Sequence, residues 1–261
     1  MTKKNKNINQ TSKELSILAS SYGLSFVVKN AGNQEKKFFE YTFDSIHSAG
    51  LFNKLEEIFT DRNLDDQSFE NITILHHNLL NSLVPLEFFD ENKPKEFLET
   101  NIKLLETDTV EFDVLKSYRM VNVFVPFTPL YQFLSRKTEK LISRHSMSRF
   151  LEKIWEIRQK NIYMPVFEIY LNIYKKDFQI VVFKNDQVQL TNQFPYENTD
   201  EFLYYLFFVW ETLNINNENM HIYISGIDKQ HEIIDNLSDF TRNYSVLPSS
   251  FASSINNYIL D

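Results

Sequence analysis

Histidine is the side chain most often used for acid–base chemistry and metal binding near neutral pH, and it occurs six times in the 261 residues. Only His76 and His77 are adjacent. We place them in a strand, where neighbouring side chains point to opposite faces, so the two rings cannot easily hold one metal ion. The chain has no cysteine, no Gly-x-Ser-x-Gly elbow, no P-loop and no His-Glu-x-x-His motif. We therefore predict no catalytic residue, no metal site and no cofactor.

Positive charge gathers in the middle of a chain whose formal net charge is −8. Residues 116–160 hold ten basic and three acidic side chains, a local charge of +7 that leaves −15 for the rest. Two interpretations stay open: a solvated face balanced by the acidic remainder, or a patch for RNA or an acidic protein. The stretch lacks the interleaved aromatics and glycines of an RNA-recognition surface, so we favour the first and do not favour nucleic acid as a partner. The basic patch would consist of Arg144, Arg149, Lys153, Arg158 and Lys160.

A predicted helix over residues 199–213 is apolar on nearly all sides between residues 202 and 210. Such a helix is typical of a layer buried between a sheet and other structure, which is the interpretation we favour. Alternatively, one flank is exposed and docks a protein partner, because aromatic side chains are enriched at interface cores. The flank in question carries Tyr205, Phe208 and Val209.

Composition places the chain among soluble, aromatic-rich proteins. Hydrophobic residues make up 43% and aromatic residues 15%, with 24 Phe and 13 Tyr, so rings must build much of the core. The absence of cysteine fits a reducing compartment. Residues 1–10 are polar and Lys-rich, unlike a secretory signal, and the longest apolar run, residues 202–210, is far below the ~20 residues that span a bilayer. We expect a cytoplasmic protein without a membrane segment.

The spacing of apolar residues predicts the same element order twice. In the first half, a hairpin over residues 15–30 turns at Tyr22-Gly23 and is followed by a strand at 38–43, a helix through 51–59 and a strand at 72–75. The second half predicts a hairpin at 167–183, a strand at 188–194, a helix capped at Asn198 or Thr199 with Glu201 in its first turn, and a strand at 221–224.

The two halves also align in sequence, which indicates a duplicated β-β-β-α-β unit. Residues 26–28 fall opposite 180–182, and residues 72–74 opposite 222–224. We further align Ser82-Leu83-Val84-Pro85 with Ser245-Val246-Leu247-Pro248, each followed three residues later by an aromatic, Phe88 and Phe251.

The fold class predicted from these elements is α/β with two tandem lobes. The middle of the chain adds strands at 111–115 and 121–126 and helices at 130–136 and 146–159. We expect a disordered tail over 1–12, a first lobe with the central basic helices over 13–160, and a second lobe over 161–261.

Two consecutive units of this kind resemble the duplicated ribonuclease-H-like fold of the actin, Hsp70 and sugar-kinase superfamily, and the chain looks like the small bacterial members used in pilus and secretion assembly. More narrowly, the chain resembles a bacterial domain-of-unknown-function family, DUF3822, over most of its length. The residues that carry this likeness are Leu15-Ser16-Ile17, Tyr22-Gly23-Leu24-Ser25-Phe26, Val84-Pro85 and Leu247-Pro248. The resemblance implies an actin-like fold, and its motifs imply no chemistry.

In active members of the superfamily, the first turn of each half carries Asp-x-Gly, whose carboxylate holds Mg²⁺ through water and whose glycine admits phosphate. Here the turns read Ser20-Ser21-Tyr22-Gly23 and Asn172-Ile173-Tyr174-Lys175-Lys176-Asp177, and the adenosine loop reads Ser225-Gly226-Ile227. With only four glycines, the chain has little means of wrapping a triphosphate in backbone. The resemblance implies a decayed nucleotide cleft with remnants at Ser21, Tyr22, Gly23, Asn172, Lys176, Ser225 and Gly226.

We therefore predict a protein that is not an enzyme: a scaffold or adaptor that acts through protein–protein contacts, a homodimer being one form of such contact. Two alternatives stay open. One is an actin-like protein that binds nucleotide with slow or no hydrolysis. The other is an accessory factor in ribosomal RNA modification that uses the basic patch, a role that the resemblance implies because genes of the DUF3822 family often lie beside one for a ribosomal-RNA guanine methyltransferase.

Overall fold

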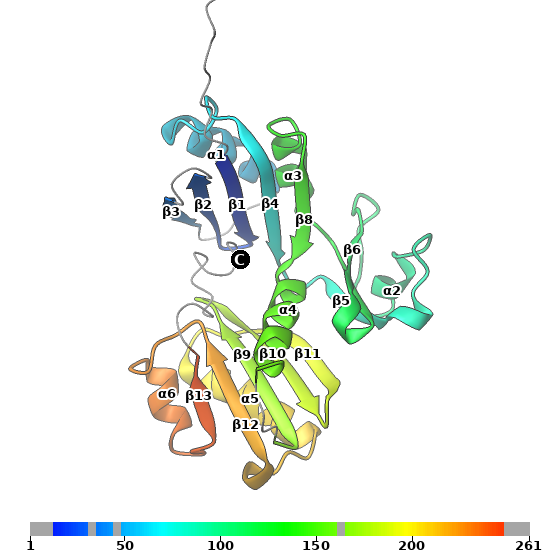
Figure 1. Cartoon of the computed structure of the whole chain (residues 1–261), viewed down its shortest axis with the longest axis vertical. Coiled ribbons are helices and arrows are strands. Elements are labelled where there is room, and N and C mark those ends of the chain that lie inside the picture. Colours follow the sequence, from blue (N-terminus) through cyan, green and yellow to red (C-terminus); the bar gives the residue numbers. More distant parts are fainter. Residues whose placement is uncertain (1–12, 31–34, 44–47, 161–164, 248–261) are drawn as a thin grey trace, which may run out of the picture. The chain divides into compact units, whose positions relative to one another are not determined.

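A five-stranded sheet forms the frame of each of the two compact units into which the chain divides (Figure 1). The computed structural model describes residues 13–30, 35–43, 48–160 and 165–247. The first unit comprises Met1–Leu75 and Phe127–Ser143, and the second comprises His76–Pro126 and Arg144–Asp261. The chain thus passes between the units three times, in place of the single boundary that the sequence predicts after residue 160. The tail expected over residues 1–12, together with Pro248 and Phe251, lies outside the described residues.

The first sheet has the strand order β3-β2-β1-β4-β8. Its strands are β1 (Lys13–Ser20), β2 (Gly23–Asn30), β3 (Lys36–Thr42), β4 (Phe69–His77) and β8 (Leu141–His145). β1 and β2 pair antiparallel in a register that opposes Ser20 to Gly23, so Ser21 and Tyr22 form a two-residue turn. This confirms the predicted hairpin, with its turn one residue earlier than the predicted Tyr22-Gly23.

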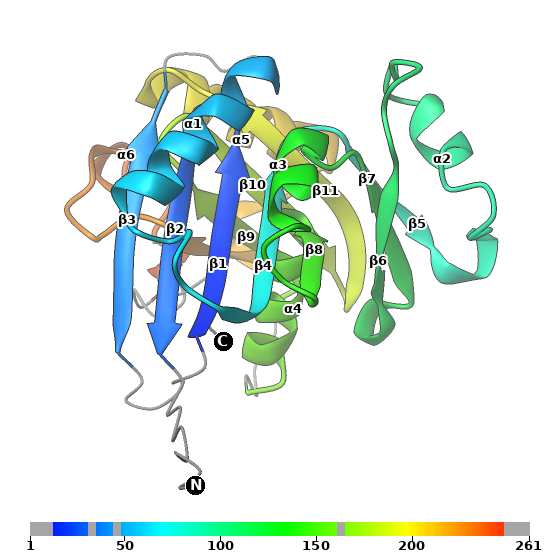
Figure 2. The same ribbon diagram turned by 90° about the horizontal axis from the view of Figure 1, so that it is seen from above.

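Two helices, α1 (Ser48–Asp61) and α3 (Thr128–Leu134), lie side by side over one face of this sheet (Figure 2). Alternate residues of β1 point toward them because successive side chains of a strand face opposite ways. Leu15, Ile17 and Ala19 are buried there against Leu55 and Ile58 of α1. The apolar residues that alternate along β1 and those that recur at helical spacing along α1 therefore pack in one core.

The second sheet repeats the first, with the order β11-β10-β9-β12-β13. Its strands are β9 (Phe167–Ile173), β10 (Asp177–Lys184), β11 (Gln187–Pro195), β12 (Met220–Ser225) and β13 (Tyr244–Val246). The three-residue helix η3 (Asn217–Asn219) precedes β12. In both sheets the first strand in chain order lies in the centre, the second and third strands follow on one side, and the fourth strand pairs with it on the other side. This shared order confirms the duplicated α/β unit.

Helix α5 (Thr199–Thr212) begins where the sequence predicts, and the cap is Asn198. The Asn198 side chain accepts a hydrogen bond of 3.0 Å from the backbone N–H of Glu201, and the acids at 200 and 201 favour the positive end of the helix dipole. Phe202 and Leu206 are buried in one core with the second sheet and with α6 (Glu232–Leu237). The helix is therefore buried on one side only.

The proline-ended segments are not equivalent, and that part of the sequence alignment is wrong. The fifth strand of the second sheet is β13, which ends before Leu247-Pro248, but its counterpart in the first sheet is β8. Residues 82–85 belong instead to β5, in a separate sheet. Residues 82–85 and 245–246 are both strand residues, and this similarity is local.

A small antiparallel sheet of order β5-β7-β6 is counted with the second unit. It consists of β5 (Asn81–Pro85), β6 (Glu111–Leu115) and β7 (Met120–Phe124), with η1 (Leu86–Phe88), α2 (Glu96–Glu99) and η2 (Lys116–Tyr118) as short helices. The strand predictions at 111–115 and 121–126 are confirmed. Helix α4 (Ser146–Arg158) contacts Tyr118 of η2, whose hydroxyl donates to the carbonyl of Leu151 at 2.8 Å.

The first hairpin predicts a matched pair of glycine substitutions. A Cβ at Gly23 would lie 2.7 Å from the backbone carbonyl oxygen of Tyr41, whereas a Cβ at Gly50 in α1 meets nothing within 4 Å. We expect Gly23→Ala to lower the free energy of unfolding by about 1–3 kcal/mol. Gly50→Ala should raise it by roughly 0.5–1 kcal/mol, because alanine loses less entropy in a helix. Urea unfolding measures both; a Gly23→Ala variant as stable as the wild type would contradict the close approach of β3.

Candidate functional site

The turn between β9 and β10 is the place where the fold would offer side chains to a phosphate, and here it is closed on itself. The backbone N–H of Tyr174 donates to the carbonyl of Asp177 at 2.9 Å. Tyr196, which follows β11, holds the turn: its hydroxyl donates to the carbonyl of Tyr174 at 2.6 Å, and its backbone N–H donates to the carbonyl of Lys176 at 3.1 Å. Tyr174 and Asp177 are buried, whereas Lys176 is exposed. Only the lysine side chains of this turn face water.

A buried imidazole joins this turn to the start of α4. The Nδ1 atom of His77 lies 2.9 Å from the hydroxyl oxygen of Ser146, and its Nε2 atom lies 2.8 Å from a carboxylate oxygen of Asp177. The ring also packs on Tyr174, with 4.0 Å between centroids, and Gln193 Nε2 lies 3.0 Å from His77 Nε2. His77 is 1% exposed and Asp177 6%, so water cannot supply these partners.

The network continues across the strands through amide side chains. Gln179 of β10 donates from Nε2 to the hydroxyl oxygen of Ser146 at 2.9 Å, and its Oε1 accepts from Asn172 Nδ2 at 3.2 Å. Asn172 also donates to the hydroxyl of Tyr174 at 2.9 Å, while the hydroxyl of Ser225 lies 3.1 Å from Asn172 Oδ1. Because buried polar groups are costly without partners, these contacts fix β9, β10 and β12 to α4. We call the set Ser146, His77, Asp177, Gln179, Asn172 and Ser225 the buried polar network.

The order hydroxyl, imidazole, carboxylate is that of a nucleophilic triad. A serine nucleophile must meet its substrate, and Ser146 is 0% exposed. Its oxygen is also within hydrogen-bond distance of both His77 and Gln179. A substrate carbonyl would have to displace these partners from a filled interior. The arrangement therefore holds structure together rather than attacking a substrate.

The other two histidines near the network are neutral. Burial lowers the pKa of His76 to about 3. Burial, and then the neighbouring rings His77 and His76, hold the pKa of His145 well below its usual range. His145 caps α4, because its Nδ1 accepts from the N–H of Met147 at 3.1 Å, and its Nε2 lies 3.1 Å from the carbonyl of Asn78. Among the described residues, no group of three or more His, Asp or Glu side chains could hold a metal ion.

The predicted remnants of a nucleotide cleft are divided between the two units. Ser21, Tyr22 and Gly23 lie in the first, where the hydroxyl of Ser20 donates to the carbonyl of Gly23 at 3.1 Å and braces the turn. Ser21 is exposed. In the second unit, the side chains of Asn172 and Ser225 point into the buried polar network and form hydrogen bonds there.

Two remnants in the second unit, Lys176 and Gly226, are accessible to a ligand. Lys176 is exposed, and Gly226 has a φ of 97°, the left-handed region that glycine adopts at no steric cost.

Four of the five basic-patch residues are held in ion pairs. Arg144 contacts Glu152 at 2.8 Å and Asp113 at 3.3 Å, and Arg149 contacts the same Glu152 at 3.3 Å. Lys153, 7% exposed, contacts Glu156 at 3.3 Å.

Arg158, 5% exposed, contacts Glu168 at 2.9 Å and Asp186 at 2.5 Å and lies over the ring of Phe183. Lys160 is exposed. The structure does not gather the five side chains on one open face.

The three predicted interface residues of α5 have different environments. Val209 is buried, Tyr205 is half-buried and Phe208 is 52% exposed. The sequence did not single out Tyr204 of α5 or Phe240 after α6, which are 64% and 53% exposed. Helical geometry offers the missing signal for Tyr204, because it precedes Phe208 by one turn on the same face.

None of the helices in the described part of the chain combines the length and the apolar composition that a membrane crossing requires.

The sequence matches the family model described as "Protein of unknown function (DUF3822)" over residues 2–244. Among solved structures, the chain is similar to a protein of Bacteroides thetaiotaomicron with an actin-like ATPase fold and unknown function, at 23% identity and a TM-score of 0.77, with 91% of each chain covered. It is also similar to a chain of the PilM–PilN type IV pilus biogenesis complex, at 13% identity and a TM-score of 0.60, covering 95% of this chain and 94% of the other. No curated protein matches. The actin-like ATPase fold expected from the sequence is thereby confirmed.

The buried polar network predicts unequal effects for two serines. Ser146→Ala removes a hydroxyl that contacts His77 and Gln179 and so takes one hydrogen-bond partner from each of these buried side chains, and we expect a loss of about 1–3 kcal/mol in the free energy of unfolding. Ser21→Ala, at an exposed turn position, should change it by less than about 0.5 kcal/mol. Urea denaturation of both variants is the measurement. Equal stability of the two would mean that the network is not what fixes α4 to the second sheet.

Proposed function

The chain belongs to the DUF3822 family, and from its fold and surfaces we propose that it is a non-enzymatic adaptor that binds another protein on helix α5. The observation that carries this proposal is the exposure of large aromatic side chains on the outer side of that helix. Tyr204 is 64% exposed and Phe208, one turn later, is 52% exposed. Exposed aromatics that cluster are typical of interface cores, where they bury large rigid surfaces.

The exposed rings continue on both flanks of α5 into what we call the aromatic band. On one flank Tyr205 stacks on Phe194 of β11, with 4.7 Å between centroids, and touches Tyr204 at 5.3 Å. On the other flank Phe207 packs on Phe240 at 4.7 Å. The band consists of Phe194, Tyr204, Tyr205, Phe207, Phe208 and Phe240. Because Tyr204, Tyr205 and Phe207 already pack on neighbouring rings, these three would lose little side-chain entropy on binding.

Charge around the aromatic band selects the partner. The sequences of α5 and α6 contain five acidic residues and no Lys or Arg. A second copy of the chain would bring these acids together, and like charges at an interface are unfavourable. The occupant that fits is a different protein that presents apolar side chains flanked by Lys or Arg. A homodimer through this surface is disfavoured for the same reason.

Two further observations support an adaptor without catalysis. Within the second unit, the side chains of Asn172 and Ser225 form hydrogen bonds with each other and with neighbouring residues, so few of their donors and acceptors remain for a phosphate. The structurally similar chain of the PilM–PilN complex belongs to an assembly of proteins by its own description. We infer that the actin-like fold serves here to present surfaces that bind another protein.

A nucleotide binder with slow or no hydrolysis is the second candidate. The exposed Lys176 and the left-handed conformation of Gly226 favour it, since a lysine and an open glycine loop can both approach phosphate. An accessory role in ribosomal RNA modification has less support, because Arg144, Arg149 and Arg158 already hold acidic partners.

The adaptor proposal predicts that a double variant of the aromatic band loses its partner. Tyr204→Ser with Phe208→Ser removes the two most exposed rings of α5, and Phe88→Ser, 69% exposed on η1, is the matched control. Cross-linking in cells followed by mass spectrometry identifies candidates that depend on the band. Each is then purified and titrated by calorimetry.

We expect direct binding to the wild type and the control, at least tenfold weaker binding to the double variant, and weakening by salt. Two results would contradict the proposal. One is a set of captured proteins identical for all three chains. The other is a wild-type dimer in sedimentation that the double variant abolishes, because the band would then join two copies.

A further inference from the structure

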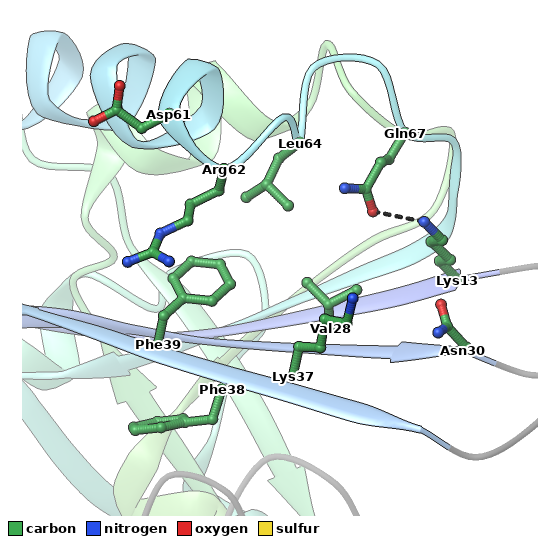
Figure 3. A pocket seen from close by; sticks show the side chains of 10 residues that line it. All are labelled: Lys13, Val28, Asn30, Lys37, Phe38, Phe39, Asp61, Arg62, Leu64 and Gln67. Atoms are coloured by element: carbon green, nitrogen blue, oxygen red, sulfur yellow. Dashed lines mark hydrogen bonds between the residues drawn. The ribbon is translucent and has the colours of Figure 1, made fainter.

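A pocket of about 520 Å³ opens in the first unit, where the start of β1, the end of β2, the start of β3 and the last turn of α1 come together (Figure 3). It is unrelated to the predicted nucleotide remnants of this unit, which lie in the turn at the opposite ends of β1 and β2. The lining side chains are Lys13, Val28, Asn30, Lys37, Phe39, Arg62, Leu64 and Gln67, with Phe38 and Asp61 at the margin.

Positive charge dominates the pocket. Lys13, Lys37 and Arg62 line it, and within the described residues no carboxylate forms an ion pair with any of the three. Lys13 donates from Nζ to the neutral Gln67 Oε1 at 2.9 Å. Asp61 is the one acid of the lining, and Figure 3 shows its carboxylate pointing away from the other labelled side chains. Three cations without a carboxylate partner are notable in a chain of net charge −8.

Arg62 is held in place before any ligand arrives. Its Nε donates to the hydroxyl of Tyr41 at 2.7 Å, and its guanidinium lies over the rings of Phe39 and Tyr41, 5.1 and 5.6 Å from their centroids. These contacts use Nε and the ring faces and leave the terminal nitrogens, which form the two-pronged donor that suits phosphate and carboxylate. Pre-organisation of this kind lowers the entropy lost on binding.

The floor and wall of the pocket are apolar, with one acceptor. Phe39, Val28 and Leu64 provide hydrocarbon surface beside the cations, as Figure 3 shows. The side-chain oxygen of Asn30 is buried and accepts no hydrogen bond from the described residues. A bare inorganic anion would satisfy the cations but would leave the apolar wall and the amide oxygen unused.

We propose that this pocket binds a small organic anion, a phosphate monoester or a carboxylate that carries an aromatic or aliphatic body. The anionic group contacts Arg62, Lys13 and Lys37, the body covers Phe39, Val28 and Leu64, and a hydroxyl or amine of the ligand donates to Asn30. The inference is independent of the adaptor role, because none of these residues belongs to the aromatic band of α5.

Calorimetric titration with phenyl phosphate and with benzoate tests the proposal and separates the two kinds of head group. Inorganic phosphate and the neutral benzyl alcohol are the reference probes. The variants are Lys37→Gln, which changes an exposed side chain, and Arg62→Gln, and the control is Lys103→Gln, an exposed lysine of the second unit. Urea unfolding of each variant shows whether the fold is kept.

We expect saturable binding of phenyl phosphate, benzoate or both to the wild type and to Lys103→Gln. Loss of one charge-assisted contact should weaken that binding roughly tenfold in Lys37→Gln and in Arg62→Gln. The proposal is overturned by the absence of saturable binding of both anions at millimolar concentration, or by equal affinity in Lys37→Gln and the wild type. Inorganic phosphate binding as tightly as phenyl phosphate would indicate an adventitious ion only, and benzyl alcohol binding as tightly would indicate an apolar cavity without anion selectivity.

Discussion

The hydrogen bonds that His77 makes with Ser146 and Asp177 are the constraint around which the second unit is organised. His77 ends β4, Ser146 begins α4 and Asp177 begins β10, so one buried ring ties together three elements that are distant in sequence. A buried imidazole, hydroxyl and carboxylate each need partners, and here the ring of His77 is a partner of both Ser146 and Asp177. Removing one takes a hydrogen-bond partner from a buried neighbour, which is why the cluster favours a single arrangement.

The same constraint is the physical basis for our proposal that this actin-like frame does not use nucleotide. A phosphate loop needs a carboxylate aimed outward, toward a solvated Mg²⁺, and backbone N–H groups that are open to the ligand. In this chain the carboxylate of the second turn, Asp177, is 6% exposed and is directed at His77. Asn172 is likewise turned inward. The polar residues remain in the turn, but packing has turned them toward the interior of the unit.

Sequence patterns predicted the duplicated sheets because alternation and helical spacing are local properties. The pairs of strands, the helices near 51–59 and 199–213 and the cap at Asn198 all follow from neighbours a few residues apart. Strand β8 was missed because its sequence, Leu-Ile-Ser-Arg-His, has no clear alternation, and its place beside β4 is set by tertiary contacts.

The candidate sites were harder to predict, since their partners are remote in the chain. His77 meets Asp177 one hundred residues away, and Arg144 meets Asp113 thirty-one residues away. A count of basic residues within one stretch of sequence does not show that they pair with acidic residues elsewhere in the chain. The sequence did not predict the pocket around Arg62 for a similar reason. Lys13 lies in β1, Lys37 in β3 and Arg62 directly after α1, so only the fold brings them together.

The most direct test of the central claim, that the polar turn of the second unit serves the fold and not a nucleotide, is thermal unfolding with and without millimolar Mg-ATP, Mg-ADP and Mg-GTP. A ligand at about one hundred times its Kd stabilises by roughly 2.7 kcal/mol, which raises the midpoint of a protein of this size by several degrees. We predict a cooperative transition whose midpoint none of the three nucleotides shifts. A nucleotide-specific rise that Lys176→Gln diminishes would contradict the account and make the second candidate function the better one.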